Sequence, residues 1–138
     1  MRRNGFGGGG AVAYPAAMSS PIQRRVGQVF VPVRDMTAAI RWYAAVLGFE
    51  PGVTSHEGTI YDIPTDGETR LALDANRPDF DAGGPPRFFL WTHDMAATIE
   101  HLHRLDVRIT SDVQDIGSVF FVQFEDPDGN ALMVCQRA

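Results

Sequence analysis

Hydrophobic positions in the first ordered part of the chain change from a period of two to a helical period. Valine occupies every second position of 29–33, which is typical of a strand with one buried face. Apolar residues then recur at helical spacing over 36–47. Asp35 is placed to cap the start of this helix and Gly48 to end it. This pattern predicts a strand followed by a capped helix.

The same order of periods returns 59 residues later. The stretch 33–40, VRDMTAAI, recurs as 92–99, THDMAATI, with aspartate, methionine, alanine and isoleucine in step. Alternation over 88–92 predicts the second strand, and Asp94 is placed to cap the helix that follows it. This helix is expected to end near Asp106. Self-similarity at this period indicates a duplicated supersecondary unit. Neither unit can bury its own apolar face, so function is expected at their junction or inside the curve that they enclose.

Each helix is followed by short alternating segments that predict hairpin strands. These segments are 58–63 and 69–74 in the first unit, and 119–124 and 131–136 in the second. Turns containing proline and glycine link each pair. Each unit therefore reads βαβββ. We predict one domain over 25–138 with two modules, at about 26–75 and 86–137, after a disordered tail rich in glycine and alanine over 1–22.

Composition narrows the chemistry that the chain can perform. The net charge of −5 disfavours nucleic acid as a partner and suits cationic or neutral ligands. All 12 basic residues are arginine, which excludes Schiff-base chemistry on lysine. The single cysteine, Cys135, cannot form an intrachain disulfide, so a reducing, cytoplasmic setting is expected. No apolar run approaches the length that spans a bilayer, and no membrane partner is expected.

Two stretches carry a resemblance to a known family. The strand, cap and helix of 29–49, which end in LGF, and the segment FEDPDGN at 124–130 resemble the vicinal oxygen chelate superfamily. That group includes glyoxalase I, extradiol dioxygenases, fosfomycin-resistance enzymes and bleomycin-resistance binding proteins. The resemblance covers about 26–136. It implies an α+β fold in which two tandem βαβββ modules form a curved, cup-shaped mixed sheet, often in a homodimer.

Strand alternation indicates which side chains line the cup. The face opposite the helix-packing residues is expected to face the cavity. This face comprises Gln28, Phe30, Pro32, Arg70, Ala72, Asp74, Arg87, Phe89, Trp91, Phe121, Gln123, Met133 and Cys135. The predicted lining is therefore aromatic and apolar, with few charges.

Enzymes of the superfamily hold a divalent metal with four side chains, which the resemblance places at Gln28, Ala72, Arg87 and Met133. Alanine has no donor atom, arginine is a permanent cation, and a thioether is a soft ligand poorly suited to Mg, Mn or Ni. We therefore expect no metal cofactor. A divalent metal in an atypical site around Gln28 or His56 is kept as the alternative.

Other reactive side chains support both structural and functional interpretations. His101 and His103 are expected on the solvated face of the second helix. His56 and Glu57 lie in a turn, where they could contact a ligand at the rim. Cys135 is expected to be buried and inert.

Asp74 is a further candidate reactive group. Asp74 could pair with Arg70 or Arg87, either as an acid/base or anion-holding pair or as a structural ion pair.

The sequence thus favours a metal-free small-molecule-binding protein of the glyoxalase/bleomycin-resistance type, a homodimer that sequesters an antibiotic or another aromatic or cationic natural product. The expected ligand-binding residues are Gln28, Phe30, Arg87, Phe89, Trp91, Phe121 and Met133. The catalytic alternative is a lyase, isomerase or dioxygenase of the same superfamily with an atypical site, whose catalytic residues the sequence does not identify. A third alternative is a partner-binding module with no small ligand. In a purely structural interpretation, the aromatic side chains only fill the cup or support a dimer.

Overall fold

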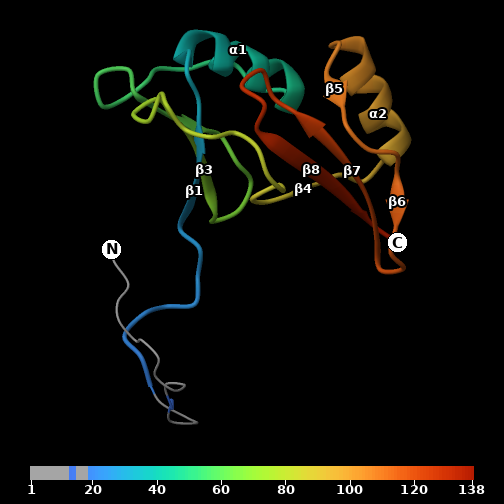
Figure 1. The fold of residues 1–138 in the computed structure, drawn as a ribbon, viewed down its shortest axis with the longest axis horizontal. Helices are drawn as coiled ribbons and strands as arrows, with labels where there is room; N and C mark the ends of the chain where they lie inside the picture. The colour runs from blue at the N-terminus through green and yellow to red at the C-terminus, as the bar shows by residue number, and fades with distance from the viewer. Residues whose placement is uncertain (1–12, 15–18) are drawn as a thin grey trace.

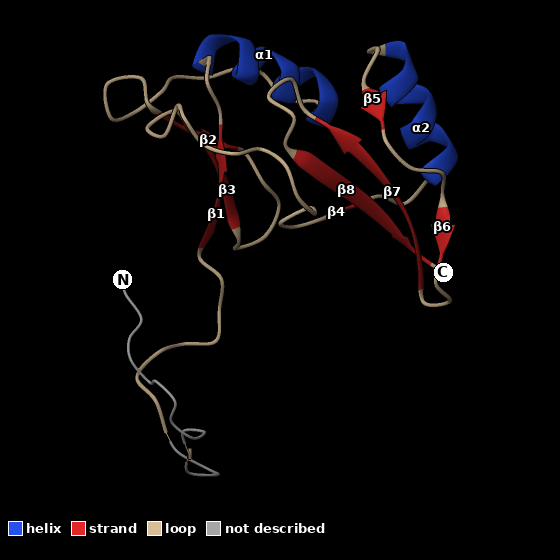
Figure 2. Ribbon diagram, in the orientation of Figure 1, coloured by secondary structure: helices blue, strands red, loops and turns tan. Residues whose placement is uncertain are grey.

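The computed structural model describes residues 13–14 and 19–138. Most of the predicted tail, 1–22, lies outside the described residues. The rest forms two sheets that occupy neighbouring halves of the molecule, each with its own helix (Figures 1 and 2). This arrangement confirms an α+β fold built from two βαβββ modules. The strands form two separate sheets, and the curved, cup-shaped arrangement of the modules stays a prediction.

The first sheet has the strand order β1-β3-β2. Its strands are β1 (Gln28–Pro32), β2 (Ile60–Ile63) and β3 (Arg70–Asp74). β3 is parallel to β1 and antiparallel to β2. An isolated bridge between Ser55 and Ile60 stands in place of the remaining strand of the module.

The second sheet has the strand order β4-β8-β7-β5, and β6 also pairs with β7. Its strands are β4 (Leu90–Trp91), β5 (Arg108–Ile109), β6 (Gln114–Asp115), β7 (Val119–Glu125) and β8 (Ala131–Arg137). β5 and β6 pair with opposite ends of β7, so together they act as one interrupted strand. This interrupted strand completes the second βαβββ unit.

Both helices begin where their aspartate caps predict. In α1 (Met36–Leu47), the carboxylate of Asp35 accepts a hydrogen bond from the backbone N–H of Ala38, and Gly48 ends the helix with φ 77°. In α2 (Met95–Arg104), Asp94 makes the same contact with Ala97. The similar geometry of the two caps agrees with the repeated sequence. Among the described residues, neither helix has the length and hydropathy that crossing a membrane requires.

One hydrophobic core joins the two modules. Alternate residues of β1 and β3 pack against α1, and alternate residues of β7 and β8 pack against the same cluster. Its members include Val31, Val33, Ile40, Tyr43, Leu71, Leu73, Leu102, Val122, Phe124, Leu132 and Val134. The opposite faces of both sheets are therefore left for a ligand or a partner.

Polar contacts reinforce this junction at the turn between β7 and β8. The side-chain amide of Asn130 donates to the backbone oxygen of Pro32 at 2.9 Å. The guanidinium of Arg34 contacts Asp128 at 3.2 Å and donates to the backbone oxygen of Phe80. The loop between the modules is thereby held against both of them.

Candidate functional site

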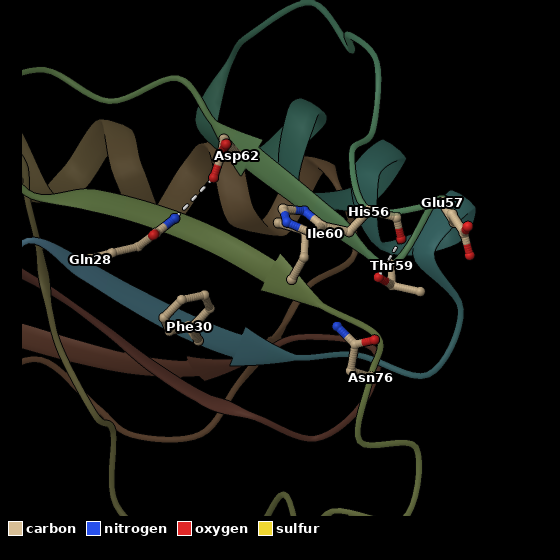
Figure 3. Close-up of a pocket in the computed structure, with 8 residues that line it drawn as sticks. All are labelled: Gln28, Phe30, His56, Glu57, Thr59, Ile60, Asp62 and Asn76. Atoms are coloured by element: carbon tan, nitrogen blue, oxygen red, sulfur yellow. Dashed lines mark hydrogen bonds between the residues drawn. The ribbon is translucent and has the colours of Figure 1, made fainter.

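An open pocket of about 720 Å³ lies on the face of the first sheet that points away from the core. β1 and β2 contribute two residues each, the turn before β2 contributes three, and the segment after β3 contributes one (Figure 3). The lining residues are Gln28, Phe30, His56, Glu57, Thr59, Ile60, Asp62 and Asn76. Every one of these residues belongs to the first module or to the segment that follows it.

Strand alternation explains why these side chains converge. Val29 and Val31 pack in or against the core, so Phe30 faces the opposite side of β1. Tyr61 and Ile63 of β2 are buried in the same core, so Asp62 faces outward as well.

Ala72 links these two outward positions. It pairs with Phe30 on one side and with Asp62 on the other, and is itself fully buried. Phe30 and Asp62 therefore lie on either side of β3, with Ala72 between them.

Hydrogen bonds orient the polar groups of the pocket. Nε2 of Gln28 donates to Oδ1 of Asp62 at 2.9 Å (Figure 3). The hydroxyl of Thr59 donates to the backbone oxygen of His56 at 2.7 Å, and Nδ2 of Asn76 donates to Asp74 at 2.8 Å. The side-chain nitrogens of Gln28 and Asn76 thus each donate one hydrogen bond within the protein, while their carbonyl oxygens can still accept.

The charges of the pocket complement this acceptor-rich lining. Its eight lining residues include the carboxylates of Asp62 and Glu57 and no arginine. The phenyl ring of Phe30 is 49% exposed and forms an apolar side. A ligand with a flat apolar part and a cationic or donor-rich part would match both sides.

The second sheet carries an exposed group of aromatic side chains, here called the aromatic patch and formed by Phe89, Trp91 and Arg137. The two rings meet edge to face with centroids 4.9 Å apart, and the Arg137 guanidinium lies 3.8 Å from the centroid of Trp91. Phe89 is 46% exposed and Trp91 48% exposed. An apolar surface of this kind is costly to leave in water.

The structure does not gather the seven predicted ligand-binding residues into one pocket. Gln28 and Phe30 line the pocket of the first sheet, whereas the other five lie on or beside the second sheet. There, Phe89 and Trp91 belong to the aromatic patch, Phe121 and Met133 are half-buried, and Arg87 is exposed before β4. Within one chain, the two groups form separate surfaces.

Asp74 corrects one prediction. Its carboxylate is 5% exposed and pairs with Arg77 at 2.7 Å, instead of with Arg70 or Arg87. Burial alone would raise the pKa of Asp74, but hydrogen bonds from Asn76 and the charge of Arg77 outweigh it and hold this pKa below its ordinary value. Asp74 is therefore a structural anchor that fixes the start of the following loop.

Cys135 and His101 are buried or half-buried, and their contacts indicate structural roles. Cys135 is buried, and burial raises the pKa of its thiol, so the reactive thiolate is disfavoured. His101 differs from its predicted surface role, because it is half-buried and its Nε2 lies 3.0 Å from the backbone oxygen of Val46. It thus joins α2 to the end of α1, while His103 is exposed as expected.

The residues at the predicted metal positions do not fit a divalent metal. Ala72 is fully buried and has no donor atom, Arg87 is a permanent cation, and the thioether of Met133 is a soft ligand. Among the described residues, no three histidine, cysteine, aspartate or glutamate side chains come together in a way that could hold a metal ion. We therefore derive no step through such an ion.

Sequence reasoning missed Ile60, Asp62, Thr59 and Asn76 as lining residues. A signal existed for Asp62, because it is the polar residue between two apolar ones in a predicted strand. Thr59 and Asn76 enter from segments whose path depends on strand pairing, and no local pattern identifies them.

Comparison with solved structures supports the fold. TnmS3, an antibiotic binding protein from Streptomyces sp. CB03234, has a TM-score of 0.68 and 26% identity, over 87% of this chain and 100% of that chain. A member of the glyoxalase/bleomycin resistance protein/dioxygenase superfamily from Sphaerobacter thermophilus DSM 20745 has a TM-score of 0.68 and 22% identity. The match covers 83% of this chain and 98% of that chain. Lactoylglutathione lyase from Agrobacterium tumefaciens has a TM-score of 0.65 and 20% identity, and the match covers 85% of this chain and 96% of that chain.

Sequence comparison identifies the family. No curated protein is significantly similar to the chain in sequence. The model of the Glyoxalase/Bleomycin resistance protein/Dioxygenase superfamily matches residues 25–134, which include the first module and the second as far as the middle of β8. With its paired βαβββ units and the pocket on the open face of the first sheet, the chain belongs to the glyoxalase/bleomycin resistance protein/dioxygenase superfamily.

Proposed function

We propose that this protein binds and sequesters a small, flat organic molecule with a cationic or donor-rich group, and that it does so without a metal. The observation that carries the proposal is the pocket of about 720 Å³, where Phe30 offers an apolar face opposite the carboxylate of Asp62. A volume in this range accommodates a drug-sized ligand. The antibiotic-binding protein at 26% identity supports the same class of function.

The proposed binding form is a homodimer in which the first sheet of one copy faces the second sheet of the other. The aromatic patch does not line the pocket of its own chain, and Phe89 and Trp91 are each almost half exposed. A second copy would cover the patch and bring Trp91 opposite Phe30. We place this dimer in the cytoplasm, where the single buried thiol stays reduced.

Binding can be tested with proflavine, a planar cationic dye whose fluorescence changes when it enters an apolar site. We expect saturable binding by the wild-type protein, and at least a tenfold weaker affinity in Phe30→Ala and in Asp62→Asn. Val53→Ala is the matched control, because Val53 is an apolar residue that is 92% exposed outside the pocket. Its affinity should equal that of the wild type. Wild-type protein that shows no saturable binding would contradict the proposal.

Mixing two defective variants tests whether the site is shared between copies. Phe30→Ala damages the first-sheet half, and Trp91→Ala damages the half contributed by the second sheet. In a mixed dimer, one site combines both defects and the other combines two intact halves. We therefore expect dye binding to return when the variants are unfolded, mixed and refolded together. Failure of the mixture to exceed its components would show that the site lies within one chain.

A further inference from the structure

The turn that forms one wall of the pocket has an unusual backbone. His56 and Glu57 have φ values of 53° and 58°, and Gly58 follows with 87°. Left-handed conformations of this kind cost a non-glycine residue energy, because Cβ approaches the following carbonyl oxygen. Histidine occurs in this region more often than most residues, whereas glutamate does not. Two consecutive left-handed residues other than glycine are therefore strained.

Elsewhere in the described part of the chain, left-handed positions are almost all glycine. Besides Gly58, these are Gly48, Gly67, Gly84, Gly117 and Gly129. Asp106 is the other exception, and aspartate tolerates this region well. Most left-handed positions of the described chain are therefore glycine, whereas two consecutive ones beside the pocket are His56 and Glu57.

Hydrogen bonds hold the strained turn in place. The backbone of Ser55 exchanges hydrogen bonds with Ile60 at 2.9 and 3.2 Å, and also accepts one from Gly58. The hydroxyl of Thr59 donates to the backbone oxygen of His56 at 2.7 Å. The surrounding contacts therefore over-determine the conformation, as is found where strain is retained at functional sites.

The two strained residues present their side chains in different directions. The imidazole of His56 extends over Ile60 toward Gln28, on the inner side of the turn (Figure 3). Its Nδ1 lies 3.0 Å from the hydroxyl oxygen of Ser55, which fixes the ring and leaves Nε2 and the ring face for a ligand. The side chain of Glu57 extends from the outer rim, away from Ile60 (Figure 3).

We propose that His56 is a specificity-determining residue of the pocket, and that the strained turn is retained because it aims the imidazole across the pocket floor. This inference rests on the proposed binding function and names a residue that selects the ligand. A flat ligand bound over Ile60 would meet the His56 ring from the turn side and the Phe30 ring from β1. A ligand group that accepts or donates one hydrogen bond at Nε2 would be preferred.

Two glycine variants separate strain from recognition. Both His56→Gly and Glu57→Gly should relieve strain and raise Tm, by about 2–4 °C for Glu57→Gly and less for His56→Gly. Proflavine affinity should fall at least tenfold in His56→Gly and by much less in Glu57→Gly, which removes only a carboxylate at the outer rim (Figure 3). Val53→Ala, outside the pocket, should keep the wild-type affinity. His56→Asn tests the ring, because asparagine also tolerates this backbone. It should keep the wild-type Tm and bind proflavine as weakly as His56→Gly does.

The outcomes distinguish this inference from the function on which it rests. Absence of proflavine binding by the wild-type protein would overturn the proposed function, and the role of His56 with it. Tight binding by the wild type that His56→Gly retains would overturn the role of His56 alone. A lower Tm in both glycine variants would show that the turn is not strained, and would overturn the reason given for its retention.

Discussion

The hydroxyl of Tyr43 donates a hydrogen bond of 2.6 Å to Oδ2 of Asp126, although the two residues are 83 positions apart. Tyr43 lies on α1 of the first module, and Asp126 begins the turn between β7 and β8 of the second. Asp126 also accepts hydrogen bonds from Asn130 and from the backbone of Asp128. One buried carboxylate therefore shapes the turn and joins it to the neighbouring module.

Removal of this hydroxyl should weaken the whole fold. In Tyr43→Phe, a buried carboxylate oxygen loses one of its donors, which costs about 1.5–3 kcal/mol for a hydrogen bond to a charged group. Tyr61→Phe is a comparable change, because buried Tyr61 bonds the neutral backbone N–H of Gly52 at 2.9 Å. It should cost about 0.5–1.5 kcal/mol. Urea unfolding measures both, and equal losses would contradict a special role for Tyr43.

The same tyrosine predicts a loss of stability in alkali. Burial, with the negative charge of Asp126 beside it, raises the pKa of Tyr43 above its ordinary value. In the unfolded chain tyrosine ionises near pH 10, so above that pH the unfolded state loses a proton that the native state keeps. The free energy of unfolding should therefore fall above about pH 10, by up to about 1.4 kcal/mol per pH unit. Urea unfolding of Tyr43→Phe should show a shallower decline, and an unchanged slope would refute the assignment.

The pair of Asp74 and Arg77 should contribute to the decrease in the free energy of unfolding at acidic pH. Because the folded pKa of Asp74 lies below its ordinary value, its contribution is present above the unfolded pKa, near 3.9. It is lost as pH falls through the folded pKa. Asp74→Asn should flatten the acid limb of the stability curve measured by urea unfolding, whereas exposed Asp79→Asn should leave this limb unchanged. A parallel effect of both variants would argue against a specific contribution of Asp74.

Cys135 should react slowly in the native protein. It is 3% exposed on β8, and burial raises the pKa of its thiol, so both access and ionisation are unfavourable. Ellman's reagent at pH 8 should label it at a rate that follows unfolding, and within seconds in concentrated urea. Because the chain has one cysteine, the signal is unambiguous. Rapid labelling of native protein would mean that the sheet face around Cys135 opens readily.

Local signals predicted both helices and the hairpin strands that follow them, but not the short strands β5 and β6. The boundaries of α1 follow from Asp35 and Gly48, whose side-chain chemistry and backbone freedom act within one turn of the helix. β4 is shorter than its alternation suggested, because regular pairing with β8 is restricted to Leu90 and Trp91. Pairing partners lie far away in sequence, so local alternation cannot determine where pairing stops.

The candidate site was predictable only in part. Gln28 and Phe30 were found because alternation along β1 separates the core face from the open face. The contribution of His56 depends on three successive left-handed residues, a conformation that hydrogen bonds to Ser55 and Thr59 maintain. The sequence indicates a turn at His56 and Glu57, but it does not indicate the left-handed backbone of both residues, because glutamate is an uncommon choice for this conformation.

The duplication also has a consequence for cleavage of the chain. Each module has its own sheet and helix, and the contacts of Tyr43 with Asp126 and of Asn130 with Pro32 join them without using the covalent link. Cleavage in the exposed stretch 76–79 would leave each half with its complete set of strands. The two fragments should then reassociate, which would make the intact protein a tethered pair of subunits whose tether sets their effective concentration.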